Sequence, residues 1–173
     1  MTALETLLSR HAEFLAEDFE PLPSPPSLSA VVLTCVDARV DPAHTLGLEL
    51  GEAAVLRNVG GRVTPALIET LGLLIAVLEI AGPLDSLELI LLQHTDCGMA
   101  RLADHRELLA GYLEVAEEEL ASRAPADPRA AVAADIEALR AHPPLGGGRL
   151  TVSGLVYDVA DGALETVVPA SRV

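Results

Sequence analysis

The chain is poor in the residues on which several classes of binding protein depend. Its 173 residues contain no Trp, two Phe and two Tyr, and its 11 Lys and Arg face 26 Asp and Glu. So few aromatic side chains disfavour a stacking surface for single-stranded nucleic acid. The net charge of −15 disfavours binding to a phosphate backbone, which depends on Lys and Arg contacts. We therefore expect no nucleic-acid partner.

Two further shortages bear on where the protein works. Two cysteines cannot build the disulfide framework of a small secreted domain. The N-terminal segment 1–6 lacks the basic and apolar regions of a signal peptide. The longest apolar run, residues 71–78, is far too short to cross a membrane. We expect a cytoplasmic protein with no membrane partner.

Short apolar runs that alternate with helical patterns predict the fold. The runs predicted to form strands are residues 30–36, 53–56, 87–92 and 150–159, and a hairpin turn at 161–162 leads to a last strand at 163–168. The first and third runs are predicted to be buried on both faces, as in parallel sheets. The alternation indicates an α/β fold with a mainly parallel sheet of four strands, one C-terminal antiparallel strand and flanking helices. We expect residues 1–173 to form one domain.

Helix signals occupy the segments between these runs. The predicted helices cover residues 2–18, 41–46, 64–80, 99–123 and 127–140. Thr64 followed by Pro65 is a typical helix start, whereas Gly111 suggests a break in the fourth helix. The Pro and Gly residues at 143–148 are expected to end the fifth helix.

Residues 1–28 are expected to form an N-terminal helical arm with a proline-rich linker. Thr2 and Glu5 have the spacing of a capping box. One stripe of the helix is mostly apolar: Leu4, Leu7, Leu8, His11, Phe14 and Leu15. Four prolines in the segment 20–26 then break the helix and stiffen the chain. The helix either folds back on its own domain or reaches over a second subunit.

Two segments that are far apart in the sequence hold the reactive side chains. Residues 34–39 (TCVDAR) and 93–98 (QHTDCG) each follow an apolar run. At the carboxyl ends of neighbouring parallel strands they would meet in one crevice. Cys35, His94 and Cys97 would then offer two thiolates and an imidazole, which suit zinc and leave a fourth position for water.

Each of these residues has a simpler interpretation when it is taken alone. A cysteine that ends an apolar strand is most often a small buried hydrophobe. Asp37 and Arg39 would usually be a surface ion pair, and Cys35 with Cys97 could form a redox disulfide. Zinc is favoured because it accounts for all these residues at one rim. We also expect backbone N–H groups at the following helix start to favour the Cys97 thiolate.

Three motifs in order resemble those of the β-class carbonic anhydrases. Residues 35–39 match the Cys-x-Asp-x-Arg motif of that family, and residues 94–98 match its His-x-x-Cys-Gly motif. Residues 57–61 resemble its Arg-Asn-Ala-Gly loop, with Val59 in place of Ala. The resemblance runs from about Ser29 to the end of the chain and points to the short bacterial branch of the family.

The resemblance implies a ligand set and a reaction. Zinc would be held by Cys35, His94 and Cys97. Asp37 and Arg39 would form a catalytic dyad that orients zinc-bound hydroxide for attack on CO2, which gives bicarbonate and a proton. In a closed state Asp37 would itself be the fourth zinc ligand. The family also implies a homodimer in which the N-terminal helix embraces the partner, and the sequence leaves open whether dimers pair further into tetramers.

The sequence leaves the substrate open. With so few aromatics, aliphatic side chains and the backbone of Val59, Gly60 and Gly61 are expected to line the substrate pocket. Such walls do not separate CO2 from carbonyl sulfide or carbon disulfide, which relatives of this fold hydrolyse. A non-catalytic zinc domain, closed by Asp37 as fourth ligand, is a further alternative.

Overall fold

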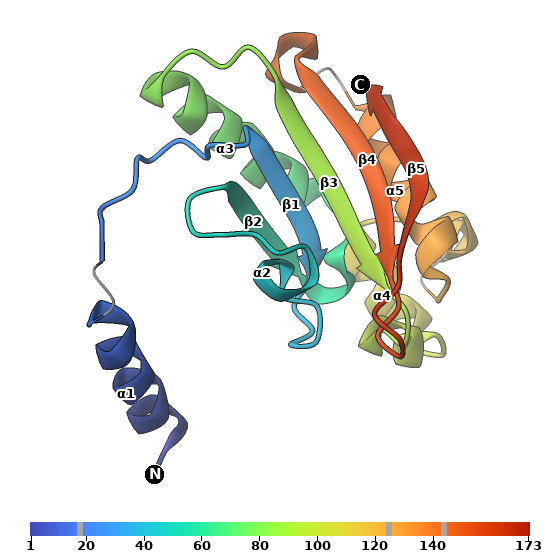
Figure 1. Ribbon diagram of the computed structural model, residues 1–173. Helices are drawn as coiled ribbons and strands as arrows, with labels where there is room; N and C mark the ends of the chain where they lie inside the picture. Colours follow the sequence, from blue (N-terminus) through green and yellow to red (C-terminus); the bar gives the residue numbers. More distant parts are fainter. Residues whose placement is uncertain (17–18, 124–125, 143–144) are drawn as a thin grey trace.

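The protein forms one five-stranded sheet with the order β2-β1-β3-β4-β5 (Figure 1). The computed structural model describes residues 1–16, 19–123, 126–142 and 145–173. The strands are β1 (Ala30–Cys35), β2 (Ala53–Asn58), β3 (Leu87–His94), β4 (Leu150–Tyr157) and β5 (Leu164–Arg172). All neighbouring pairs are parallel except β4 and β5, which are antiparallel. The predicted α/β fold is confirmed.

Most of the helices begin where the sequence provides a side-chain cap. They are α1 (Ala3–Leu15), α2 (Pro42–Thr45), α3 (Pro65–Ala81), α4 (Arg106–Leu113) and α5 (Pro128–Ala141). At the start of α3 the Thr64 hydroxyl accepts a hydrogen bond from the backbone N–H of Leu67 at 3.2 Å. At the start of α5 the Asp127 carboxylate accepts one from Arg129 at 2.9 Å. Each bond satisfies a backbone donor that a helix start leaves free.

Helices α3 and α5 cover the same face of the sheet, and in Figure 1 both lie behind it. Their buried side chains join those of the strands in one core: Leu67, Leu71, Ile75 and Leu78 from α3, and Val132, Ile136 and Leu139 from α5. Strand β1 is buried along its whole length, as predicted. The prediction of full burial was wrong for β3, where Glu88 is exposed and Ile90 half-buried, because these two side chains point away from the helix-covered face.

The predicted helix over residues 99–123 is three shorter segments. Short 3-10 helices at Gly98–Leu102 and Glu117–Arg123 flank α4. One break falls at residues 103–105. The other begins at Glu114, which has a positive φ of 52°, and not at Gly111, which lies inside α4. The segments fold together because their buried side chains form a small second core: Met99, Leu109, Ala110, Leu113 and Leu120.

The predicted ends of α1 and α5 can be followed only in part. Helix α1 ends at Leu15, and residues 17 and 18, at its predicted end, lie outside the described residues. Helix α5 ends at Ala141, one residue after the predicted end. The prolines predicted to end it, residues 143 and 144, lie outside the described residues. A 3-10 turn at Leu145–Gly148 then leads into β4.

Helix α1 stands apart from the sheet at the end of an extended segment (Figure 1). The predicted capping box is present: the Thr2 hydroxyl accepts from the Glu5 N–H at 3.2 Å, and the Glu5 carboxylate accepts from the Thr2 N–H at 2.7 Å. None of the residues of α1 is buried, so the helix does not fold back on its own domain. Within the described part of the chain, no helix has the length and apolar character needed to cross a membrane.

Candidate metal centre

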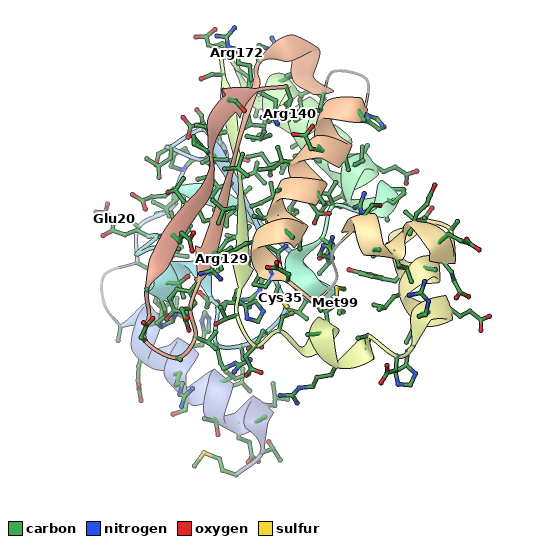
Figure 2. All side chains as sticks on the ribbon, turned by 90° about the vertical axis from the view of Figure 1, so that its right-hand side faces the viewer. Glu20, Cys35, Met99, Arg129, Arg140 and Arg172 are labelled. Atoms are coloured by element: carbon green, nitrogen blue, oxygen red, sulfur yellow. The ribbon has the colours of Figure 1, made fainter. Side chains whose placement is uncertain are left out.

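The site lies where the strand order reverses. The chain passes from β1 to its neighbour β2 on one side, and β3 then pairs with β1 on the other side. The carboxyl ends of β1 and β3 are therefore adjacent, and the crevice outside them is the usual ligand site of an open α/β sheet. Cys35 ends β1 and His94 ends β3. Figure 2 labels Cys35 and Met99 at this end of the sheet.

The three predicted metal ligands come together. One ligand atom from each of Cys35, His94 and Cys97 lies within 4.8 Å of the other two, and the two sulfur atoms are 3.9 Å apart. The His94 ring is fully buried, and its Nδ1 donates to the carbonyl oxygen of Thr95 at 2.8 Å. This bond fixes the tautomer, as is usual for metal-binding histidines.

An unpaired nitrogen atom beside two sulfur atoms shows that these residues fit a metal ion. His94 Nε2 is buried and has no hydrogen-bond partner among the described residues. An unpaired buried nitrogen is costly, and here it faces two sulfur atoms. Two thiolates and one imidazole are a donor set that suits zinc and leaves a fourth coordination position for an exchangeable group.

The contact between the two sulfur atoms shifts their pKa values in opposite directions. The hydrogen bond from Cys97 lowers the pKa of Cys35 to about 4, against the effect of burial. The N–H groups of Asp37 and Gly60 also donate to the Cys35 sulfur, at 3.4 and 3.3 Å. The same contact with Cys35, followed by burial, raises the pKa of Cys97. The backbone N–H of Met99 lowers the pKa of Cys97, as the helix start that follows leads one to expect, and a thiolate at Cys97 stays a prediction.

Arg57 holds the backbone of the Cys35 segment in place. Its guanidinium donates to the carbonyl oxygens of Cys35 at 2.9 Å and Asp37 at 2.7 Å. A third bond reaches the carboxylate of Asp41 at 3.1 Å. The sequence singled out Arg57 only as part of a family motif. Its role in holding the backbone follows from the parallel pairing that sets Arg57 opposite Thr34.

Asp37 and Arg39 form a bidentate ion pair beside the three ligands. Arg39 Nη2 lies 2.7 Å from one carboxylate oxygen of Asp37, and Nε donates to the other oxygen at 3.0 Å. The Arg39 backbone N–H also donates to Asp37, at 2.9 Å. These side-chain and backbone bonds hold the pKa of Asp37 well below its usual range, so the carboxylate is ionised at neutral pH.

The glycine loop after β2 has a backbone that only glycine adopts without strain. Gly60 and Gly61 have positive φ angles of 77° and 59°. A Cβ on Gly61 would lie 2.7 Å from the carbonyl carbon of Thr34, and one on Gly60 would lie 2.7 Å from the Met99 side chain. The loop thus packs directly on the end of β1, which is what brings the Gly60 N–H to the Cys35 sulfur.

Two side chains that the sequence did not reveal fasten this loop. The Gln93 amide donates to the carbonyl oxygen of Gly61 at 2.7 Å, and the Tyr112 hydroxyl donates to that of Val59 at 2.8 Å. Burial raises the pKa of Tyr112 to about 12, so it remains a donor. A Gln within an apolar strand and a Tyr on a distant helix carry no signal in the sequence for such roles.

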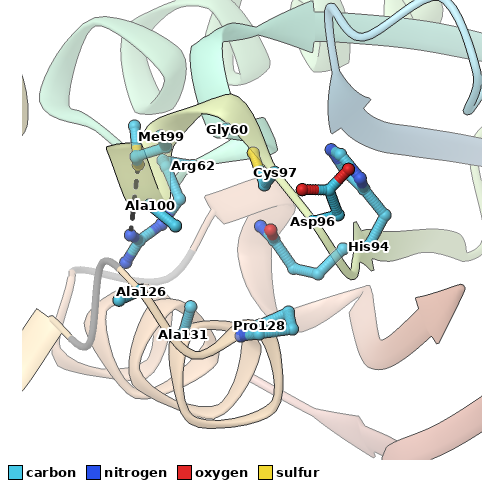
Figure 3. Close-up of a pocket in the computed structure, with 11 residues that line it drawn as sticks. Gly60, Arg62, His94, Asp96, Cys97, Met99, Ala100, Ala126, Pro128 and Ala131 are labelled. Carbon is cyan, nitrogen blue, oxygen red and sulfur yellow. Dashed lines mark hydrogen bonds between the residues drawn. The ribbon is translucent and has the colours of Figure 1, made fainter. Parts of the chain in front are cut away.

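A small cavity of about 40 Å³ adjoins the ligand set (Figure 3). His94 and Cys97 line one part of it, and Met99 and Ala131 line another. Of the three residues predicted to line the substrate pocket, only Gly60 borders this cavity. The Val59 side chain is 46% exposed, and Gly61 faces the backbone of β1.

A buried ion pair connects the loop to α5. Arg62 and Asp135 are almost fully buried, and two bonds of 2.7 and 3.0 Å join them. The Asp135 carboxylate also accepts from Arg123 at 2.9 Å and from the Val63 N–H at 3.1 Å. Such a pair is tolerated because its polar atoms are hydrogen-bonded. The sequence did not predict this ion pair because its partners are 73 residues apart.

Comparisons with known proteins agree with this geometry. The family model described as carbonic anhydrase matches residues 30–164. The chain is 32% identical to beta-carbonic anhydrase 1 of Mycobacterium tuberculosis over 174 residues, which cover 98% of this chain and 100% of that protein. The crystal structure of a carbonic anhydrase from Streptococcus mutans aligns with a TM-score of 0.72 and 29% identity, over 96% of this chain and 98% of that one.

A relative with a different printed activity matches a shorter part of the chain. A carbon disulfide hydrolase of Acidianus is 39% identical over 70 residues, which cover 40% of this chain and 31% of that protein. Similarity to proteins of both activities is expected where a fold and its metal ligands are shared but the substrate is set elsewhere.

Proposed function

Because the chain belongs to the β-carbonic anhydrase family, whose members are lyases, we propose that it catalyses the reversible hydration of CO2 to bicarbonate and a proton. One observation carries the proposal: Cys35, His94 and Cys97 converge beside an ionised carboxylate that Arg39 holds in a bidentate pair. The near-complete alignment with a curated β-carbonic anhydrase supports it.

Cys35, His94 and Cys97 would hold a zinc ion. When bound, zinc would supply a Lewis acid that makes water acidic enough to give hydroxide near neutral pH. The Thr95 carbonyl keeps His94 Nε2 free for the metal. The N–H groups of Asp37 and Gly60 stabilise negative charge on the Cys35 sulfur.

Asp37 would orient the nucleophile. An ionised carboxylate only accepts hydrogen bonds, so it can take the O–H of the attacking group and leave a lone pair directed at the carbon of CO2. Arg39 keeps Asp37 ionised and fixes the plane of its carboxylate through two parallel bonds. We also propose that the loop of Val59, Gly60 and Gly61 borders the substrate through Gly60, which lines the cavity, and that Asp37 can turn to the metal as a fourth ligand in a closed state.

A direct assay separates the proposal from the two alternatives. Zinc-loaded protein is tested on CO2, carbonyl sulfide and carbon disulfide under the same conditions, between pH 6 and 9. Hydration of CO2 as the fastest reaction is the expected result. Faster turnover of a sulfur substrate with negligible CO2 hydration would assign the chain to the hydrolases, which its similarity to the Acidianus protein makes the second candidate. No turnover of any substrate would favour a non-catalytic zinc domain.

Replacement of Asp37 by Ala tests the assignment within the site. We expect Asp37→Ala to keep its zinc but to lose turnover by about 10²–10⁴-fold, the usual contribution of a positioned acid or base. Stopped-flow hydration assays and metal analysis measure the two quantities. Asp104→Ala removes another exposed carboxylate and serves as the control. Unchanged turnover in Asp37→Ala would contradict the assigned role.

The N-terminal helix supports a proposal about assembly. The apolar side chains of α1 are exposed, for example Leu4 at 65% and Leu7 at 59%. Covering them on a second copy would remove this apolar surface from water. We propose a homodimer in which α1 packs on the partner, with further pairing into tetramers as an extension. A cytoplasmic location and the absence of a nucleic-acid partner stay predictions.

A further inference from the structure

The guanidinium group of Arg39 joins the two segments that carry the metal ligands. On one side it pairs with Asp37, two residues after Cys35. On the other side Nη1 donates to the carboxylate of Asp96 at 2.9 Å, and Nη2 donates to the backbone carbonyl oxygen of Asp96 at 3.0 Å. Asp96 lies between His94 and Cys97. One side chain therefore spans both halves of the ligand set.

The backbone of Asp96 is shaped for this contact. Asp96 has a φ of 51°, the left-handed region that residues other than glycine adopt rarely and that Asp and Asn tolerate best. In this conformation the side chain and the backbone carbonyl of one residue both face the same guanidinium group. A conformation that costs free energy persists only where the surroundings fix it, and the two bonds from Arg39 do so here.

The hydrogen-bond geometry of Arg39 shows why an arginine is needed at this position. A guanidinium has five N–H groups in a rigid plane. Four bonds from Nε, Nη1 and Nη2 go to Asp37 and Asp96: Nε and Nη2 to the Asp37 carboxylate, and Nη1 and Nη2 to Asp96. A lysine ammonium lacks this planar fork and cannot bridge two carboxylates in one plane.

Exposed ion pairs usually contribute little, and the Asp96 and Arg39 side chains are 58% and 47% exposed. That rule applies to isolated pairs and weakens where bidentate geometry or a network fixes the charges. Here three charged groups and one backbone carbonyl form a single network. Arg101, at 3.8 Å from Asp96, adds a weaker fourth charge.

We propose that Asp96 is a positioning residue of the metal centre. Through Arg39 it ties the His94–Cys97 turn to the segment that carries Cys35 and Asp37. The tie holds the three ligand atoms at metal-binding distance and the Asp37 carboxylate beside them. This inference rests on the proposed function only in that Cys35, His94 and Cys97 bind a metal; it does not depend on which substrate is converted.

The test compares the zinc affinities of four variants with that of the original protein, at one pH, by competition with a chelator. Asp96→Asn removes the charge but keeps the side-chain shape and the tolerance for a positive φ. Asp104→Asn makes the same charge change at an exposed position a few residues later. Arg39→Ala removes the bridge, and the double variant Arg39→Ala with Asp96→Asn asks whether Asp96 acts through Arg39. Cobalt-substituted protein gives a visible spectrum that reports the ligand geometry, and thermal unfolding without metal reports the fold.

We expect Asp96→Asn to bind zinc about 10-fold more weakly, at the lower end of the roughly 10–100-fold cost of removing groups that orient metal ligands. Its cobalt spectrum should change, whereas unfolding without metal and the Asp104→Asn control should match the original protein. In the Arg39→Ala background the same change should cost nothing.

Three results would overturn the inference. Equal zinc affinities of Asp96→Asn and the original protein would show that Asp96 does not hold the two ligand segments together. An equal loss with and without Arg39 would show that Asp96 acts on the metal by charge alone. A failure of the original protein to bind zinc would overturn the metal site itself and the inference with it. If the zinc-loaded protein did not hydrate CO2, that result would count against the proposed function but not against this inference.

Discussion

In the described part of the chain, the metal centre leaves a buried polar atom without a partner, whereas the N-terminal helix leaves apolar side chains exposed. At the metal centre, His94 Nε2 is one of two buried side-chain nitrogen or oxygen atoms without a hydrogen-bond partner among the described residues. In α1 the backbone is well capped by Thr2 and Glu5, but no side chain of the helix is buried. The first region offers ligand atoms to a metal ion, and the second offers apolar side chains to another apolar surface.

In both regions the chemistry of the unsatisfied group indicates the kind of partner that would satisfy it. A buried nitrogen beside two sulfur atoms calls for a cation with soft ligands. A row of exposed leucines calls for burial against another apolar face. Changes in the two regions should therefore separate cleanly, one affecting the metal and the other affecting assembly.

Loss of a thiolate ligand should have the largest effect. We expect Cys35→Ser to lower bound zinc from about one ion per chain to nearly none, because the serine hydroxyl does not ionise and a metal ligand must be deprotonated. Metal analysis of the purified protein measures this, and circular dichroism checks that the fold remains. The dimer should persist. Retained zinc in the variant would show that Cys35 is not a ligand.

Addition of a methyl group to the glycine loop should have the next largest effect. In Gly61→Ala the new Cβ meets the Thr34 and Cys35 backbone at 2.7–2.8 Å, and the positive φ becomes unfavourable. We expect the free energy of unfolding to fall by about 2 kcal/mol or more, measured with chemical denaturant. Gly72→Ala, in open space within α3, should instead gain up to about 1 kcal/mol. Equal effects of the two changes would show that the loop is not tightly packed.

A charge on the apolar stripe of α1 should weaken assembly and leave the metal centre alone. Burial of one leucine contributes about 1.5–3 kcal/mol, so Leu8→Glu should raise the dissociation constant of the dimer at least about 10-fold. Sedimentation analysis over a range of concentrations measures it. Ser9→Glu adds the same charge on the other side of the helix and should have no effect. If Leu8→Glu assembles normally, α1 does not pack on a partner.

Loss of the helix cap should have the smallest effect. Thr2→Ala removes the hydroxyl that accepts from Glu5, which typically costs about 1 kcal/mol of helix stability. Because α1 stands outside the core, we expect faster hydrogen exchange in α1 and no change in the strands. Ser9→Ala, within the same helix, is the control. Unchanged exchange in α1 of Thr2→Ala, with far-UV circular dichroism showing that the helix is folded in both variants, would show that the cap does not stabilise α1.

Local sequence patterns predicted most of the fold. The caps at Thr2, Thr64 and Asp127 and the apolar runs of β1 and β3 fix their elements through interactions within a few residues, so they can be found in the chain itself. The exceptions are instructive. The break at Glu114 and the exposure of Glu88 depend on which side chains are covered by other segments, which no local pattern records.

The features of the metal centre also separate into those that the sequence determines and those that only the fold determines. The residue types and spacing of Cys35, His94 and Cys97, with Asp37 and Arg39, were set by the sequence, because strand ends in a parallel sheet meet at one edge. Only the tertiary structure decided that Gln93 and Tyr112 fasten the glycine loop, that Arg62 pairs with Asp135, and that Asp96 shares Arg39 with Asp37. Those contacts depend on distances between segments up to 73 residues apart, and such distances exist only once the chain has folded.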